Sequence, residues 1–171
     1  MPDRLHRFAL QCYQRLPVLG RRWVVRTIAP SYTVGAMCII ERPDGALLLI
    51  RHSYRTRWGV PGGLLNRREE PDVAARREVL EEVGLPVDLL GEPAVVVDAV
   101  PQCVDLVFRA RPAHGAAIDD IRPVSAEIAE VRWFPPDELP ELQHETTTAL
   151  MALARADRDG MSGSQRRGEV A

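Results

Sequence analysis

The chain has 171 residues, the length of one ordinary domain, so a second independently folded unit is not expected. Its 46% hydrophobic residues suffice for a core without metal or disulfide staples, and its net charge of −2 argues against a general nucleic-acid-binding protein. All 22 basic residues are Arg, which excludes lysine chemistry and leaves planar guanidinium groups to meet phosphate or carboxylate. A GC-rich genome is the simplest reason for the missing Lys.

The N-terminal segment differs in charge from the rest of the chain. Residues 1–40 carry six Arg and one acidic residue, so the remainder is acidic. Apolar residues at helical spacing predict an amphipathic helix over residues 3–16, ended by Pro17 and Gly20. We therefore interpret residues 1–30 as a basic, amphipathic, helical extension. The helix either rests on the domain or contacts a membrane surface or a partner.

Apolar runs bounded by turn residues indicate the strands of the domain. We expect strands at Tyr32–Glu41, Ala46–Arg51, Ala94–Ala99, Val104–Ala110 and Val131–Phe134. The turn signal RPDGA predicts that the first two form a hairpin, and WGVPGG predicts a loop after them. A flexible loop is expected at residues 114–123, followed later by a turn at residues 135–140.

Two helices complete the predicted domain. The first begins near Pro71, a favourable first helical residue, and stops at Gly84. The second covers Gln143–Ala156, and the polar, Gly- and Ser-rich residues 157–171 are expected to form a flexible tail. These limits place the domain at residues 31–156.

The cysteines and the hydropathy pattern indicate the cellular compartment of the protein. Cys12, Cys38 and Cys103 are odd in number and widely spaced, so neither a disulfide framework nor a zinc site is expected. No apolar run approaches the length of a membrane span, and the N-terminus has no secretory signal pattern. We therefore expect a cytoplasmic protein.

Acidic residues concentrate around the first predicted helix of the domain. Six fall within positions 69–82: Glu69, Glu70, Asp72, Glu78, Glu81 and Glu82. At about 100° per residue, the last three share an arc of about 100°. Like charges this close destabilise a helix unless a cation offsets them, and Mg²⁺ or Mn²⁺ binds carboxylate oxygens together with phosphates. The alternative for an isolated acidic helix is a solvated face paired with Arg76 and Arg77.

The full spacing favours the metal interpretation. From Gly63 the chain reads five residues, Glu69, seven residues, and then REVLEEVGL, which ends at Leu85. This segment resembles the complete box of the Nudix hydrolase family, GX5EX7REUXEEXGU, where U is aliphatic. The segments WGVPGG and EVRWFPPDELP resemble the family as well, so the resemblance covers roughly residues 31–156.

The resemblance implies an α/β/α sandwich with a mixed β-sheet and a Mg²⁺-dependent hydrolase of nucleoside diphosphates linked to another moiety X, with Mn²⁺ as a substitute. The implied metal ligands are Glu78, Glu81 and Glu82, with the Gly63 carbonyl and Glu69 assisting. Arg77 would orient a catalytic glutamate, and Gly62 would leave room for the phosphate. Glu82 is our first choice as general base, and Glu127, just before the last strand, is its rival. Dimers are frequent in the family, so the resemblance leaves a homodimer open as the oligomeric state.

Three further arginines precede the box. Arg51, Arg55 and Arg57 are candidates to grip phosphate, although each could be an ordinary exposed charge. Trp58 is interpreted as a packing residue, and His52 is assigned no role because no sequence neighbour suggests a triad or zinc site.

The substrate is left open by the sequence. Signatures for NADH, coenzyme A and dinucleoside polyphosphates are missing, and Pro101, near where ADP-ribose hydrolases carry a Pro, more simply ends a strand. Nucleoside triphosphates, NDP-sugars and ADP-ribose therefore compete as substrates. The alternative function is a non-catalytic nucleotide-sensing module, against which the intact set of glutamates argues.

Overall fold

The computed structural model describes residues 14, 16–18, 20, 29 and 31–168. The chain divides into two units, Met1–Tyr32 and Thr33–Ala171, and the second unit contains all the strands and helices described below. The predicted helix over residues 3–16, and with it most of the predicted extension 1–30, lies outside the described residues.

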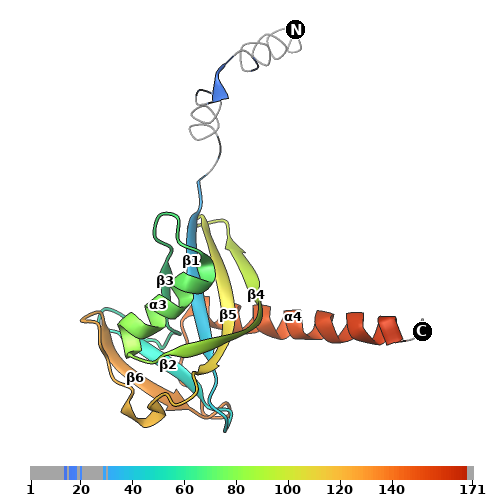
Figure 1. The fold of residues 1–171 in the computed structure, drawn as a ribbon. Helices are drawn as coiled ribbons and strands as arrows, with labels where there is room; N and C mark the ends of the chain where they lie inside the picture. Colours follow the sequence, from blue (N-terminus) through green and yellow to red (C-terminus); the bar gives the residue numbers. More distant parts are fainter. Residues whose placement is uncertain (1–13, 15, 19, 21–28, 30, 169–171) are drawn as a thin grey trace. The chain divides into compact units, whose positions relative to one another are not determined.

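The domain is built on a mixed four-stranded sheet and a two-stranded sheet (Figure 1). The larger sheet has the order β3-β1-β5-β4, with β1 parallel to β5 and antiparallel to β3. Its strands are β1 (Thr33–Ile40), β3 (Gly62–Leu64), β4 (Val87–Asp98) and β5 (Cys103–Pro112). The smaller sheet pairs β2 (Leu47–His52) with β6 (Ile128–Phe134), and a short 3-10 helix covers Ile118–Asp120.

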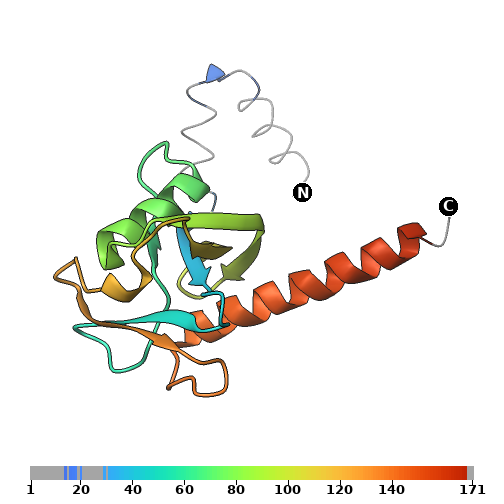
Figure 2. The ribbon, with the colours of Figure 1, turned by 60° about the horizontal axis from the view of Figure 1, so that its bottom comes forward.

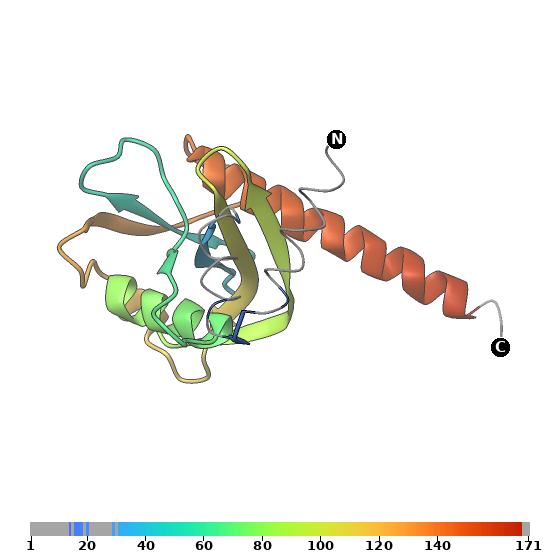
Figure 3. The ribbon, with the colours of Figure 1, turned by 90° about the horizontal axis from the view of Figure 1, so that it is seen from above.

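Two α-helices cover opposite faces of the larger sheet, α3 (Pro71–Val83) and α4 (His144–Gly168) (Figure 3). The alternation of side chains along β1 explains this arrangement. Cys38 and Ile40 are buried in the cluster that contains Val79 of α3, whereas Ile39 is buried in the cluster that contains Leu153 of α4. The expected α/β/α sandwich with a mixed sheet is therefore confirmed.

Helix α3 has the termini that the sequence predicts. Pro71 is at its start, where a missing N–H costs nothing. Gly84 ends it in the left-handed conformation, at φ 69°, and its N–H donates to the carbonyl of Leu80. These two residues define the start and the end of the helix that carries Glu78, Glu81 and Glu82.

Three local predictions were wrong. The chain does turn back between β1 and β2, but the two strands separate into different sheets after one bridge between Glu41 and Leu47. The reason is that β3 and β5 already occupy both edges of β1. Strand β3 lies inside the predicted WGVPGG loop and the residue after it.

The third difference concerns the C-terminal helix. Helix α4 continues to Gly168, so residues 157–168 of the expected flexible tail are helical (Figure 2). Asp157, the first residue past the predicted end, pairs with Arg109 of β5 at 2.6 Å. This contact anchors the helix to the sheet beyond Ala156.

Within the described part of the chain, Cys38 and Cys103 are both free thiols, as expected. No helix among the described residues has the length and hydropathy that crossing a membrane requires.

Candidate active site

The carboxylates of α3 differ in their surroundings. Glu82 is buried, with 7% of its surface exposed, whereas the side chain of Glu81 is 59% exposed and that of Glu78 is 16% exposed. Val79 and Val83 of the same helix lie in the core, whereas Leu80 is 53% exposed.

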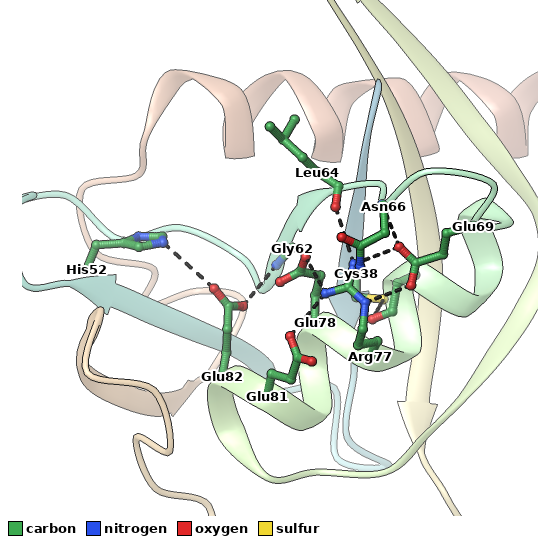
Figure 4. A network of polar contacts seen from close by, with 11 residues as sticks. Cys38, His52, Gly62, Leu64, Asn66, Glu69, Arg77, Glu78, Glu81 and Glu82 are labelled. Carbon is green, nitrogen blue, oxygen red and sulfur yellow. Dashed lines mark hydrogen bonds and ion pairs between the residues drawn. The ribbon is translucent and has the colours of Figure 1, made fainter. Parts of the chain in front are cut away.

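Arg77 is the centre of the charged network in Figure 4. Its Nε and Nη2 atoms donate to the two carboxylate oxygens of Glu69 at 2.7 and 2.9 Å. Its Nη1 atom donates to Glu78 at 2.8 Å and to Glu81 at 3.0 Å. One guanidinium thus connects three of the four box glutamates, in the bidentate geometry to which Arg is suited.

Glu69 is fixed in the loop before α3. Besides its two bonds to Arg77, it accepts a hydrogen bond from the backbone N–H of Asn66 at 2.7 Å. The Arg77 guanidinium, more than the Asn66 bond, holds the pKa of Glu69 at about 2. Glu69 therefore stays ionised and acts on the site through Arg77.

Glu82 connects α3 to β2 and to Gly62 and Gly63, which we call the glycine loop. Its Oε2 atom accepts a hydrogen bond from the Gly62 N–H at 3.0 Å, and its Oε1 atom lies 3.8 Å from His52 Nε2. Burial, helped by the charges of Glu78, Glu127 and Glu81, raises the pKa of Glu82 to about 8 against the opposing effect of the Gly62 hydrogen bond. Glu82 therefore takes up and releases a proton near neutral pH.

Sequence reasoning missed His52, which has no acidic neighbour along the chain. The two-stranded sheet nevertheless brings it beside Glu82, and its Nδ1 atom is buried without a hydrogen-bond partner. Burial and the charge of Arg55 lower the pKa of His52, so its imidazole is neutral at physiological pH.

The two glycines of β3 allow a close approach of chain and carboxylate. A Cβ atom on Gly63 would lie 2.5 Å from Glu78 Oε1, and one on Gly62 would lie 2.4 Å from the carbonyl oxygen of Ala36. Both distances are shorter than any van der Waals contact. At Gly62 the backbone of β1 leaves no room for a Cβ atom, whereas at Gly63 the Glu78 carboxylate would have to move aside.

A cavity of about 470 Å³ opens beside these glycines. It lies between the glycine loop, the loop after β2 and the start of α4. Its polar lining includes Asp105, Gln143, Glu145, Tyr54, Arg55 and His52. Of the predicted site residues, Gly62, Gly63 and Arg55 line it.

The three candidate phosphate-binding arginines are not brought together. Arg51 pairs with Glu130 across the β2–β6 ladder, and Arg57 pairs with Glu141 at 2.7 Å. Arg55 lines the cavity but donates to Gln143 Oε1 at 2.9 Å and to Glu145 Oε1 at 3.2 Å. These contacts hold the loop after β2 against the start of α4.

Glu127 lies on the loop before β6 and is exposed. Its backbone carbonyl accepts from the Ser53 N–H at 2.8 Å, which anchors the loop after β2. Its charge acts on both Glu82 and His52, so it lies near the buried carboxylate without lining the cavity.

The donor set suits a hard divalent cation, since Glu78, Glu81 and Glu82 project carboxylate oxygens from one side of α3 (Figure 4). As placed, no three His, Cys, Asp or Glu side chains of the described residues converge closely enough to hold an ion. Glu78 and Glu81 are engaged by Arg77 instead. A cation would therefore compete with the Arg77 guanidinium for these two carboxylates.

Comparison with known proteins identifies this arrangement. Residues 31–153 match the family model of the NUDIX domain, so the chain belongs to the Nudix family. Its members generally use divalent cations and act on nucleotide derivatives. The protein is a pyrophosphohydrolase of this family.

Three proteins show how similar this chain is to known members of the family. A MutT-like protein from Streptomyces ambofaciens is 35% identical over 115 residues, which are 67% of this chain and 71% of that protein. The putative 8-oxo-dGTP diphosphatase 3 of Mycobacterium tuberculosis (strain ATCC 25618 / H37Rv) is 31% identical over 163 residues, covering 81% of this chain and 75% of that protein. The structure of a NUDIX hydrolase from Nitrosomonas europaea superposes with a TM-score of 0.63 at 28% identity, over 71% of this chain and 69% of that one.

Proposed function

We propose that the protein is a Mg²⁺-dependent hydrolase of the pyrophosphate linkage of nucleoside diphosphate derivatives, with nucleoside triphosphates of the 8-oxo-dGTP type as the first substrates to test. One observation carries the proposal: the acidic face of α3, with buried Glu82, adjoins a cavity of about 470 Å³ through Gly62 and Gly63. The relative in M. tuberculosis that is named a putative 8-oxo-dGTP diphosphatase supports this choice of substrate.

The residues have separate roles in this proposal. Glu78, Glu81 and Glu82 would hold Mg²⁺, with Glu69 and the Gly63 carbonyl assisting. The bound ion supplies charge neutralisation of the pyrophosphate and an acidified water. Gly62 and Gly63 leave room for phosphate oxygens at the mouth of the cavity.

The proton of the attacking water goes to Glu82. The Gly62 N–H fixes one oxygen of this carboxylate, and the other faces His52, which lines the cavity. Arg77 orients Glu78 and Glu81 through its Nη1 atom, and Glu69 holds Arg77 in place. Glu127, exposed on the loop before β6, is the second candidate for the base.

A hydrolysis screen that separates the product nucleoside monophosphate from the substrate by ion-exchange chromatography tests the proposal. Nucleoside triphosphates including 8-oxo-dGTP, NDP-sugars, ADP-ribose and dinucleotides are offered with Mg²⁺, with Mn²⁺ and with EDTA. We expect turnover of a nucleotide with Mg²⁺ and none with EDTA. Nucleotide binding without turnover in either metal would favour a sensing module instead.

A further inference from the structure

The cavity beside the glycine loop has a chemically uneven lining. Half of its polar side chains are acidic or amide, with Asp105 and Glu145 the two carboxylates. Arg55 is the cationic residue among those that line it, and its Nη1 atom already donates to Gln143 and Glu145. A phosphate group placed near Asp105 would meet uncompensated negative charge. The pyrophosphate therefore belongs at the glycine end, and an uncharged group at the Asp105 end.

Asp105 faces the α4 side of the sheet. It lies two residues before Val107, which is buried under α4, and successive side chains of a strand alternate between faces. In the register of the sheet Asp105 stands beside Gly35 of β1, and a Cβ atom on Gly35 would lie only 2.3 Å from Asp105 Oδ1. The missing side chain of Gly35 leaves the carboxylate room to lie over β1 at the cavity wall.

Asp105 also has hydrogen-bonding capacity to spare. Among the described residues, the hydrogen-bond donor to its side chain is the thiol of Cys103, whose Sγ lies 3.4 Å from Oδ1. A carboxylate accepts about four hydrogen bonds and donates none when ionised, and a thiol is a weak donor. The free capacity faces the cavity, whose apolar walls are Met37, Val60 and Leu64.

A second cavity of about 200 Å³ shares Met37, Asp105 and Glu145 with the first. Val96 and Thr148 are among its other lining residues. Asp105 thus stands where the two spaces meet. A ligand that reaches from the glycine loop to Asp105 therefore passes between apolar side chains. It then meets a carboxylate that accepts hydrogen bonds and donates none.

We propose that Asp105 is the specificity-determining residue of this cavity and that it accepts a pair of hydrogen bonds from the edge of a guanine-type base. This inference rests on the proposed nucleotide hydrolysis. A guanine ring offers two adjacent donors, the ring N1–H and the exocyclic amino group, which match two carboxylate oxygens. Adenine, cytosine and thymine each place an acceptor against one of those oxygens, which leaves a polar group unpaired. The cis-diol of a ribose also offers two adjacent donors, and the experiment separates the two sources.

The test compares four substrates and four ligands. Values of kcat/KM are measured for GTP, dGTP, ITP and ATP with Mg²⁺, and Kd values for GMP, dGMP, IMP and AMP, which need no turnover. We expect guanine to be preferred over hypoxanthine and adenine on the order of 10- to 100-fold, because one well-placed bidentate pair gives that discrimination. The deoxy forms should lie within about threefold of the ribo forms, since the contact is to the base.

The variant Asp105→Asn provides the sharper comparison. An amide has one acceptor and one donor, so we expect it to weaken guanine binding and to improve adenine binding, which general misfolding would not do. Asp88→Asn, on the neighbouring strand β4 and paired with Arg111 at 3.7 Å, is the matched control and should leave the guanine-to-adenine ratio unchanged.

Three results would overturn the inference. They are equal use of guanine and adenine by the wild type, an unchanged ratio in Asp105→Asn, and a preference that follows the 2′-hydroxyl rather than the base. Failure of the proposed function is distinguishable from these results. Without turnover of any nucleotide the hydrolase assignment fails, while tighter binding of GMP than of AMP still supports the role of Asp105.

Discussion

Replacement of Glu82 by Gln should make the metal-free protein more stable. Burial raises the pKa of Glu82 from 4.5 to about 8, so its ionisation is unfavourable in the folded state relative to the unfolded chain. A carboxyl group with a raised pKa contributes most to stability below pH 4.5, and this contribution is lost as the pH rises to 8. Gln has the same shape, keeps an acceptor for the Gly62 N–H and does not ionise.

The size of the effect follows from the pKa difference. At pH 7 the unfolded carboxyl group is ionised and the folded one is mostly protonated, which corresponds to about 3 kcal/mol in favour of Glu82→Gln. At pH 5 the same relation gives less than about 1 kcal/mol. Urea unfolding in EDTA, followed by tryptophan fluorescence at pH 5, 6 and 7, measures both values.

The control for this experiment is Glu81→Gln. Glu81 has an exposed side chain on the same turn of α3, so its replacement removes the same charge without relieving burial. We expect no comparable gain in stability from it. Glu82→Gln no more stable than the wild type at pH 7, or a gain that does not shrink toward pH 5, would refute the reasoning.

Three other predictions follow from the same geometry. Glu69→Gln should destabilise the protein at pH 7, and this difference should disappear as the pH falls from 4.5 toward 2, because Arg77 holds the pKa of Glu69 at about 2; unfolding at pH 7 and pH 3 measures it. Gly62→Ala should cost about 3 kcal/mol or prevent folding, since its Cβ would lie 2.4 Å from the Ala36 carbonyl oxygen; a loss below about 0.5 kcal/mol would contradict the packing. The Cys38 thiol, whose burial raises its pKa to about 12, should not react with a disulfide reagent at pH 8 until urea unfolds a variant in which the other two cysteines are Ser.

Local patterns predicted the elements whose signals lie within a few residues of each other. Pro71 and Gly84 define α3 because helix termini depend on the residues at those positions, and the box glutamates follow from their spacing on one helix. The assignment of β1 and β2 to different sheets was not predictable in this way, because it depends on β5, more than 60 residues further along the chain.

The same limit applies to the site. His52 comes to lie beside Glu82 only through the folding of the two-stranded sheet against α3. Gln143 and Glu145 reach the cavity because α4 begins there. Asp105 did leave a signal in the sequence, an acidic residue near the start of a strand, on the same face as buried Val107.

The most direct test of the account compares turnover by Glu82→Gln and Glu127→Gln on the best substrate of the screen, at saturating Mg²⁺. Removal of a general base ordinarily lowers kcat by about 10²–10⁴-fold, and we expect this loss for Glu82→Gln and a loss below about tenfold for Glu127→Gln. Full activity of Glu82→Gln would contradict the assignment of the buried carboxylate of α3 as the catalytic base.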